Sequence, residues 1–184
     1  MNTRRLGKRL GVCAFVAAAL IGTAGAAAYY GGVRINTTES MPVGLWIVAA
    51  GAVIERGQVV SVCPVPGTVM AMARERGYVP SGVCPGHYEP LIKPVAAIAG
   101  DVVTVTSEGV AVNGVAVPNT RQALADGAGR PMPRITPGEY PVASGTVWIL
   151  SSYNAASFDS RYFGPLPVTN IEGIARPLFT KGAL

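Results

Sequence analysis

A serine and a lysine are the residues of this sequence whose types and surroundings best suit covalent chemistry. Ser40 precedes Met41-Pro42, and proline fixes its own φ while keeping the preceding residue out of the helical region. We therefore expect rigid, extended backbone at Ser40, at the edge of a sheet. A serine hydroxyl becomes a good nucleophile only when a base removes its proton. Lys93 lies inside the apolar run Leu91–Ile98, where a solvated lysine is not expected, and is the candidate base.

Other bases for Ser40 are poor candidates. The single histidine, His87, is expected to be a loop residue, the neighbouring Glu39 is expected to be solvated, and no Gly-x-Ser-x-Gly pattern occurs. Lysine acts as a base only when neutral, so its pKa must fall from about 10.4 towards 7. Burial among apolar neighbours disfavours the ammonium and lowers the pKa. On the pattern alone, the alternative is a surface lysine on an edge strand that extends its ammonium into water.

The N-terminal charge and hydropathy pattern indicates a membrane segment. Residues 10–33 carry no charge and are long enough to span a bilayer as a helix. Four basic residues precede this run, so the net charge of +5 indicates topology rather than a nucleic-acid partner. We expect a cytoplasmic segment (1–9), an anchor (10–33) and an exported domain (34–184) that faces the periplasm from a bacterial inner membrane. The alternative is a cleaved secretory signal ending near Ala26-Ala27-Ala28, which would leave a periplasmic protein.

The remaining chain is predicted to be a mainly β, antiparallel domain, because it contains many short strands and no sustained helical period. Val110–Val112 and Val115–Val117 flank Asn113-Gly114, the strongest hairpin signal in the chain. Residues 121–141 are polar and rich in proline and glycine, and are predicted to form a surface loop. The other predicted strands are 45–49, 58–62, 91–98, 101–106, 146–151 and 171–178, the last of which closes the sheet, with a short helix at 68–76.

Cys63 and Cys84 both lie in proline-rich sequence on the expected exported side. An oxidising compartment favours pairing them, and closing a loop of this length would stabilise the fold by about 3 kcal/mol. Cys13 falls in the apolar run and is expected to be a small apolar residue. Two cysteines and His87 fall short of a zinc set, so we expect no metal and no other cofactor.

Three blocks of sequence, in order, resemble the type I signal peptidases, which are membrane-anchored Ser-Lys proteases. The blocks are Ser40-Met41-Pro42, then Lys93 followed by Gly100-Asp101, then Ser157 to Gly164. The form Asn-x-Thr-x-Ser-Met-Pro-x-Gly is more similar to the conjugative-transfer branch, the TraF pilin-maturation peptidases. The resemblance covers most of the chain after Asn36 and implies a signal-peptidase-like β domain.

The resemblance implies roles for individual residues. Ser40 is the nucleophile and Lys93 the general base, Thr38 contributes to the oxyanion hole, and Ser157 hydrogen-bonds and orients the lysine. Asp159 and Arg161 form an ion pair beneath the site, and in the conjugative branch the aspartate is counted with the catalytic set.

Two departures from the family pattern stand out. Pro94 replaces the usual arginine after the lysine, which indicates an edge strand or a bulge because proline donates no ladder hydrogen bond. Ser151-Ser152-Tyr153-Asn154 replaces a Gly-Asp-Asn opening, so the pocket beneath Lys93 is expected to differ.

The resemblance implies a serine endopeptidase that cleaves an exported peptide precursor after a small residue. Water, or the amino group of the same substrate, would resolve the acyl-enzyme, and the second route would cyclise a pilin. The alternatives are a general type I signal peptidase and a non-catalytic factor of conjugation or pilus assembly. Intact Ser40, Lys93 and Ser157 argue against the non-catalytic alternative.

Overall fold

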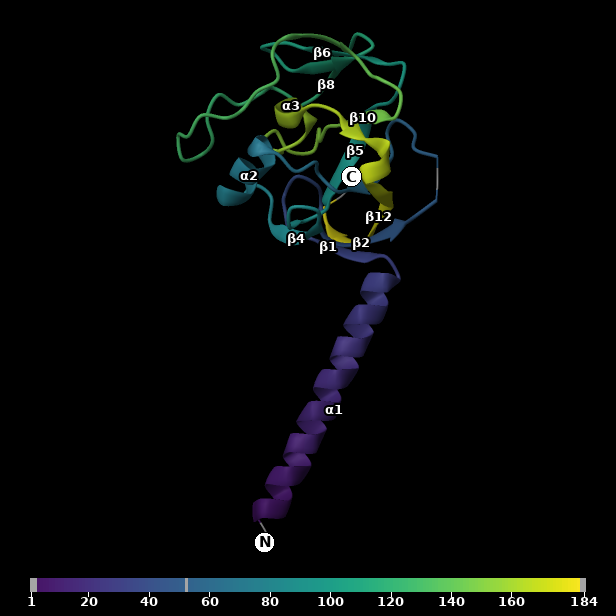
Figure 1. Cartoon of the computed structure of the whole chain (residues 1–184), viewed down its shortest axis with the longest axis vertical. Coiled ribbons are helices and arrows are strands. Elements are labelled where there is room, and N and C mark those ends of the chain that lie inside the picture. Colours follow the sequence, from purple (N-terminus) through teal and green to yellow (C-terminus); the bar gives the residue numbers. More distant parts are fainter. Residues whose placement is uncertain (1–2, 52, 183–184) are drawn as a thin grey trace. The chain divides into compact units, whose positions relative to one another are not determined.

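The computed structural model describes residues 3–51 and 53–182, and the chain divides into two compact units, 1–34 and 35–184. The first unit contains helix α1 (Thr3–Tyr30), which begins before the uncharged run 10–33 and ends three residues before the end of that run (Figure 1). Its segment Cys13–Tyr30, with a mean hydropathy of 1.6, is long and apolar enough to cross a membrane. A signal sequence has the same properties, so the helix alone does not separate the two alternatives.

The second unit is built on a seven-stranded sheet with the order β1-β2-β12-β3-β5-β10-β11. The pairs β2–β12, β12–β3, β3–β5, β5–β10 and β10–β11 are all antiparallel, which confirms the predicted fold class. The strands are β1 (Val33–Asn36), β2 (Val43–Ala49), β3 (Val59–Val62), β5 (Leu91–Ala97), β10 (Thr146–Ile149), β11 (Leu166–Pro167) and β12 (Ile171–Lys181).

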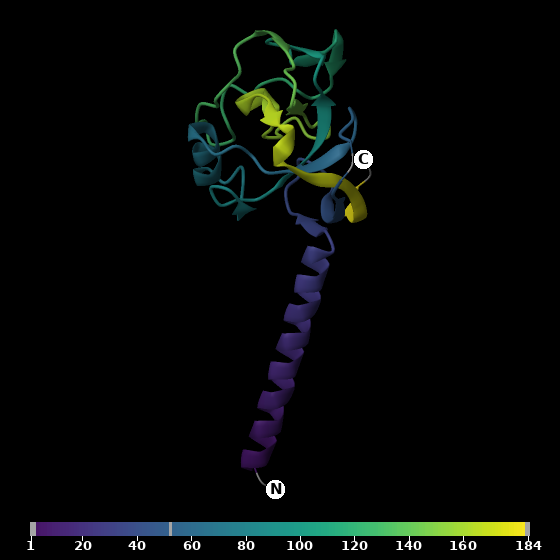
Figure 2. The ribbon, with the colours of Figure 1, turned by 45° about the vertical axis from the view of Figure 1, so that its right-hand side comes forward.

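A smaller sheet, with the order β8-β7-β6-β9, lies at the end of this unit away from β2 (Figures 1 and 2). It comprises β6 (Val102–Val105), β7 (Val110–Val112), β8 (Val115–Val117) and β9 (Gly138–Pro141). The predicted hairpin joins β7 to β8, and its two turn residues, Asn113 and Gly114, have positive φ angles of 50° and 79°. Two successive positive φ angles are what a type I′ turn requires.

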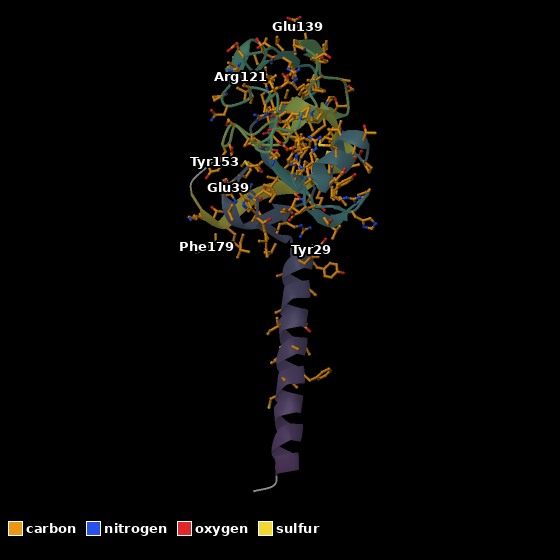
Figure 3. All side chains as sticks on the ribbon, turned by 90° about the vertical axis from the view of Figure 1, so that its left-hand side faces the viewer. Tyr29, Glu39, Arg121, Glu139, Tyr153 and Phe179 are labelled. Atoms are coloured by element: carbon orange, nitrogen blue, oxygen red, sulfur yellow. A yellow bond between two sulfur atoms is a disulfide. The ribbon has the colours of Figure 1, made fainter. Side chains whose placement is uncertain are left out.

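Short elements complete the domain: α2 (Thr68–Glu75), β4 (Ser81–Cys84), α3 (Ser160–Phe163) and a 3-10 turn (Val168–Asn170). The labelled Glu39, Arg121, Glu139, Tyr153 and Phe179 lie at the periphery of the β domain (Figure 3), and apolar side chains fill its interior. Both tryptophans, Trp46 and Trp148, are buried there, as expected of core aromatics.

The sequence-based strand assignment was incomplete. The predicted surface loop 121–141 ends in β9, which pairs with β6, and β1, β4, α3 and β11 were not predicted. The strand that begins at Ile171 does not close the sheet at an edge. β12 lies inside the sheet, where it pairs with β2 on one side and β3 on the other.

Candidate active site

Ser40 lies in the turn that joins β1 to β2, and not in extended backbone as the sequence suggested. Its side chain is partly exposed, while the following Met41 is buried. At Gly44 the backbone has a φ of 142°, and a Cβ there would lie 2.2 Å from the carbonyl oxygen of Phe179 on β12. The close approach of β12 therefore requires a glycine at position 44, two residues after Pro42.

Side chains hold every carbonyl group of this turn from Thr38 to Pro42. Asn154 Nδ2 donates to the Glu39 carbonyl at 3.2 Å, and Ser151 Oγ donates to the Ser40 carbonyl at 2.5 Å. Asn36 Nδ2 donates to the carbonyls of Thr38, Met41 and Pro42 at 2.9, 3.0 and 3.1 Å. A backbone held at five successive carbonyls has little freedom to move, so the position of Ser40 is tightly defined.

Lys93 reaches Ser40 from the interior of the large sheet. Its Nζ donates a hydrogen bond to Ser40 Oγ at 2.5 Å, although the two residues are 53 positions apart in the sequence. Lys93 is only 3% exposed, and its position on β5 pairs with Val60 on β3. The alternative of a solvated edge lysine is therefore wrong.

Burial lowers the pKa of Lys93 to about 8. The largest cause is loss of solvent around the ammonium; the negative charge of Asp159 raises the pKa, and the positive charge of Arg161 lowers it. With that pKa, roughly one lysine in ten is neutral at pH 7 and carries a free lone pair.

Pro94 marks a bulge and not an edge. β5 is flanked by β3 and β10, and the register with β10 shifts between Trp148 and Ile149. The N–H of Val95 donates to the Gln58 carbonyl, next to β3, while the Pro94 carbonyl accepts from Leu150 on the β10 side. Proline thus stands where the ladder with β10 is already irregular, and no donor is missed.

Thr38 lies beside the nucleophile. Its Oγ1 is 3.0 Å from Ser40 Oγ and 3.0 Å from Asn36 Oδ1. From this position Thr38 can donate to an oxyanion that forms next to Ser40, the role that the family resemblance implies and that stays a prediction.

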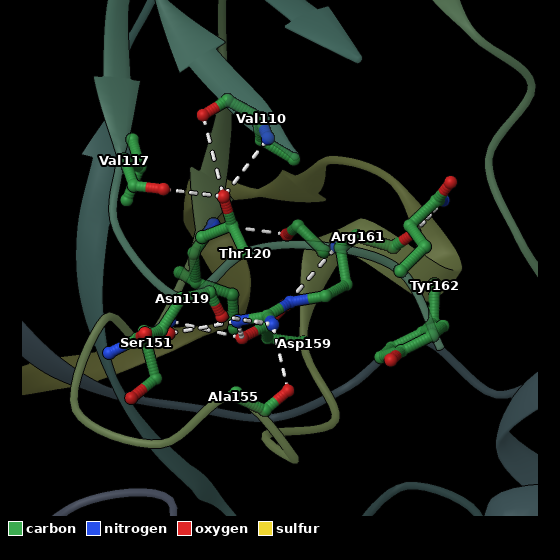
Figure 4. Close-up of polar contacts among 12 residues, drawn as sticks. Val110, Val117, Asn119, Thr120, Ser151, Ala155, Asp159, Arg161 and Tyr162 are labelled. Carbon is green, nitrogen blue, oxygen red and sulfur yellow. Dashed lines mark hydrogen bonds and ion pairs between the residues drawn. The ribbon is translucent and has the colours of Figure 1, made fainter. Parts of the chain in front are cut away.

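Asp159 and Arg161 form a fully buried ion pair (Figure 4). Arg161 Nε and Nη2 donate to the two carboxylate oxygens at 2.8 and 2.9 Å. Arg161 also donates to the carbonyl oxygens of Asn119, Ala155 and Ser151, so its guanidinium joins three segments of chain. Because Asp159 also begins α3 by accepting from the Arg161 backbone N–H, the pair organises the structure beneath the site.

Ser157 is buried, but its Oγ has no hydrogen-bond partner among the residues that the structure describes. The predicted hydrogen bond from Ser157 to Lys93 is therefore not formed here. Its role as an orienting residue stays a prediction.

Sequence reasoning missed Ser151 and Asn36. Ser151 accepts from Arg161 through its carbonyl, donates to Asp159 through its N–H and donates to the Ser40 carbonyl through its hydroxyl. It connects the buried ion pair to the nucleophile turn at the position where the family pattern has glycine. The sequence shows that Ser151 departs from the family pattern, but it does not show that Ser151 contacts Ser40, 111 positions away.

The predicted disulfide joins Cys63, next to β3, to Cys84 at the end of β4. His87 lies in the exposed turn beyond it. No group of three or more potential metal-ligating side chains occurs within residues 3–51 and 53–182.

A family model described as signal peptidase, peptidase S26 matches residues 5–179. This chain belongs to the signal peptidase S26 family. Family membership agrees with the sequence resemblance and makes the protein a peptidase by descent.

Similar proteins include a plasmid transfer protein TraF of Escherichia coli, 42% identical over 154 residues that cover 84% of this chain and 86% of that protein. A probable conjugal transfer protein TraF of Sinorhizobium fredii is 44% identical over 184 residues, covering 97% of this chain and 94% of that protein. Among solved structures, a signal peptidase I of Enterococcus faecalis matches with a TM-score of 0.37 at 17% identity, covering 68% of this chain and 98% of that one.

Proposed function

We propose that this member of the S26 family is a serine endopeptidase that uses a Ser-Lys pair. The observation that carries the proposal is the 2.5 Å contact between Ser40 Oγ and the buried Lys93 Nζ. Burying a lysine costs folding free energy, and this lysine touches the hydroxyl that needs a base. The contact also disfavours a non-catalytic assembly factor, which would have no need for it.

The reaction follows from this geometry. Neutral Lys93 accepts the Ser40 proton while Ser40 Oγ attacks the scissile carbonyl carbon, and Thr38 Oγ1 donates to the oxyanion that forms. As the peptide C–N bond breaks, Lys93 passes the proton to the leaving amine, which leaves an ester on Ser40. Water, with Lys93 again as base, then releases the acid; if an amino group of the substrate attacks instead, a new peptide bond forms.

Supporting residues keep this pair in its working state. The Asp159 carboxylate raises the pKa of Lys93 and the Arg161 guanidinium lowers it, so the Asp159–Arg161 ion pair sets the pKa of the base. The same ion pair holds Ser151 against the nucleophile turn. Ser157 Oγ is buried and has no hydrogen-bond partner among the described residues, so we propose it as the group that orients Lys93 during turnover.

We further propose that the substrate is a pilin precursor of a conjugation system, with small residues near the cleavage site. The similarity to TraF proteins of plasmid and conjugal transfer along most of both chains supports this substrate over a broad set of secreted precursors. The apolar helix α1 would anchor the enzyme in the inner membrane and leave the β domain in the periplasm.

The test is mass spectrometry of the pilin precursor of the same transfer system, made with and without this protein. We expect removal of terminal residues, and a further loss of one water if the chain ends are joined. Lys93→Arg should be as inactive as Ser40→Ala, because guanidinium keeps its proton at any accessible pH. Lys181→Arg, at an exposed lysine, is the matched control and should process normally. Normal processing by Lys93→Arg would remove lysine from the mechanism.

A further inference from the structure

The hydrogen bonds around Asn36 fix which way its amide faces. The backbone N–H of Thr38 can only donate, and it points at one end of the amide, 3.2 Å away. Three carbonyl oxygens, which can only accept, surround the other end. The first end must therefore be the oxygen Oδ1 and the second the nitrogen Nδ2, because the reverse would place donor against donor and acceptor against acceptor.

This orientation decides where the hydroxyl protons of the site lie. Asn36 Oδ1 can only accept, so the Thr38 hydroxyl 3.0 Å away must donate to it. Thr38 has no second proton, so in its 3.0 Å contact with Ser40 it must accept the Ser40 proton. Ser40 then has no proton left for Lys93, and Lys93 donates to Ser40.

We propose that Asn36 is a positioning residue that sets the direction of this hydroxyl chain, so that in the resting enzyme the Ser40 proton points at Thr38 and away from Lys93. The inference rests on the proposed Ser-Lys mechanism for its functional meaning. In this resting order Lys93 donates to Ser40, Ser40 donates to Thr38, and Thr38 donates to Asn36.

Catalysis needs two of these protons to change their acceptor. The Ser40 proton must turn to the lone pair of neutral Lys93, and the Thr38 proton must turn from Asn36 to the substrate oxyanion. Both changes are rotations about a C–O bond and need no movement of the heavy atoms held by the turn. A substrate carbonyl placed near Thr38 supplies an acceptor that can draw its proton away from Asn36. Thr38 Oγ1 can still accept from Ser40, so the Ser40 proton moves to the base because the lone pair of neutral Lys93 is the stronger acceptor.

Asn36 also braces the turn, and its two ends separate the two roles. Nδ2 holds backbone carbonyls, whereas only Oδ1 touches the Thr38 hydroxyl. If Asn36 acts on the pKa of Lys93 through the hydroxyl chain, its effect on that pKa must vanish when the Thr38 hydroxyl is absent. If Asn36 acts only by bracing the turn, its effect on the pKa of Lys93 must persist without that hydroxyl.

The test is the titration of Lys93 followed by NMR of the full chain labelled at the lysine side chains, of which the sequence has only Lys8, Lys93 and Lys181. In Asn36→Ala the freed Thr38 proton can go to Ser40, and Ser40 can donate to neutral Lys93. One added hydrogen bond to the neutral amine should lower the pKa of Lys93 by roughly half to one pH unit. The charged groups that act on Lys93, Asp159 and Arg161, are unchanged in this variant.

The nearly isosteric Thr38→Val should give the same fall, and adding Asn36→Ala to it should change nothing further. A bracing role alone would instead admit water, and so raise the pKa of Lys93 in both backgrounds. A rise, or equal effects with and without the Thr38 hydroxyl, overturns the proposal. If Asn36→Ala does not fold, Thr38→Val alone decides, because an unchanged or raised pKa in it contradicts the resting order.

The matched control is Asn154→Ala, which removes a brace from the same turn without touching Thr38. The pKa of Lys93 should be unchanged in this variant. The readout needs no substrate, so it is independent of the proposed function. If the predicted titrations occur but no precursor is cleaved, the peptidase proposal fails and the hydroxyl order stands.

Discussion

Replacing Lys93 by methionine should stabilise the protein at neutral pH while abolishing its activity. Methionine fills a similar volume without a charge, and the lysine occupies a site that is 97% covered, since only 3% of it is exposed. The folded protein holds the pKa of Lys93 at about 8 against an ordinary value of 10.5. The folded state therefore disfavours the ammonium, and the methionine variant no longer bears that cost.

The size of the effect follows from the two pKa values. Below pH 8 the lysine is protonated in both the folded and unfolded chains, and the cost is roughly 3 kcal/mol. Losing the hydrogen bond to Ser40 offsets about 1 kcal/mol, which leaves a net gain of about 2 kcal/mol in the free energy of unfolding. For a chain of this size that gain raises Tm by roughly 4–8 °C.

The pH dependence has a definite sign. Between pH 8 and 10.5 the unfolded chain binds the extra proton, so the stability of the wild-type protein rises with pH and the advantage of methionine shrinks. Thermal unfolding of the full chain in detergent at pH 7 and pH 10 measures both values, with Lys181→Met as the exposed control. A variant that is no more stable at pH 7, or whose advantage is equal at both pH values, would refute this account of Lys93.

Three further outcomes follow from the structure. Arg161→Ala leaves a buried carboxylate unpaired and should cost about 3–5 kcal/mol in denaturant unfolding; a loss below 1 kcal/mol would contradict the central role of that pair. Replacing Cys63 and Cys84 by serine should cost about 3 kcal/mol, and an unchanged unfolding midpoint would count against the disulfide. Ser151→Ala removes the donor to the Ser40 carbonyl and should lower kcat about five- to tenfold at constant KM, whereas a change confined to KM would place Ser151 in substrate binding.

The sequence predicted what depends on local pattern. The hairpin at Asn113-Gly114 needed only its own turn residues, and the burial of Lys93 could be inferred from its apolar neighbours. The residues of the site appeared as three separate blocks, and their order in the chain indicated the family before any contact was known.

What could not be predicted depends on contacts between distant segments. The donation from Ser151 to the Ser40 carbonyl joins residues 111 positions apart, and no periodicity reports such a contact. The Pro94 bulge is compatible with an edge strand until β10 is placed beside β5. Asn36 could be read as an ordinary strand-ending residue, because its five hydrogen bonds arise only once the turn has closed.

The position of β12 bears on when the enzyme can become active during its own biogenesis. Because β12 separates β2 from β3, the sheet that carries the nucleophile turn and the lysine strand stays divided until residues 171–181 have been made. Such long-range pairing is slow to form. Under the proposed mechanism, a partly synthesised chain that lacks β12 holds Ser40 and Lys93 on unjoined parts of the sheet, and we expect it to cleave no precursor.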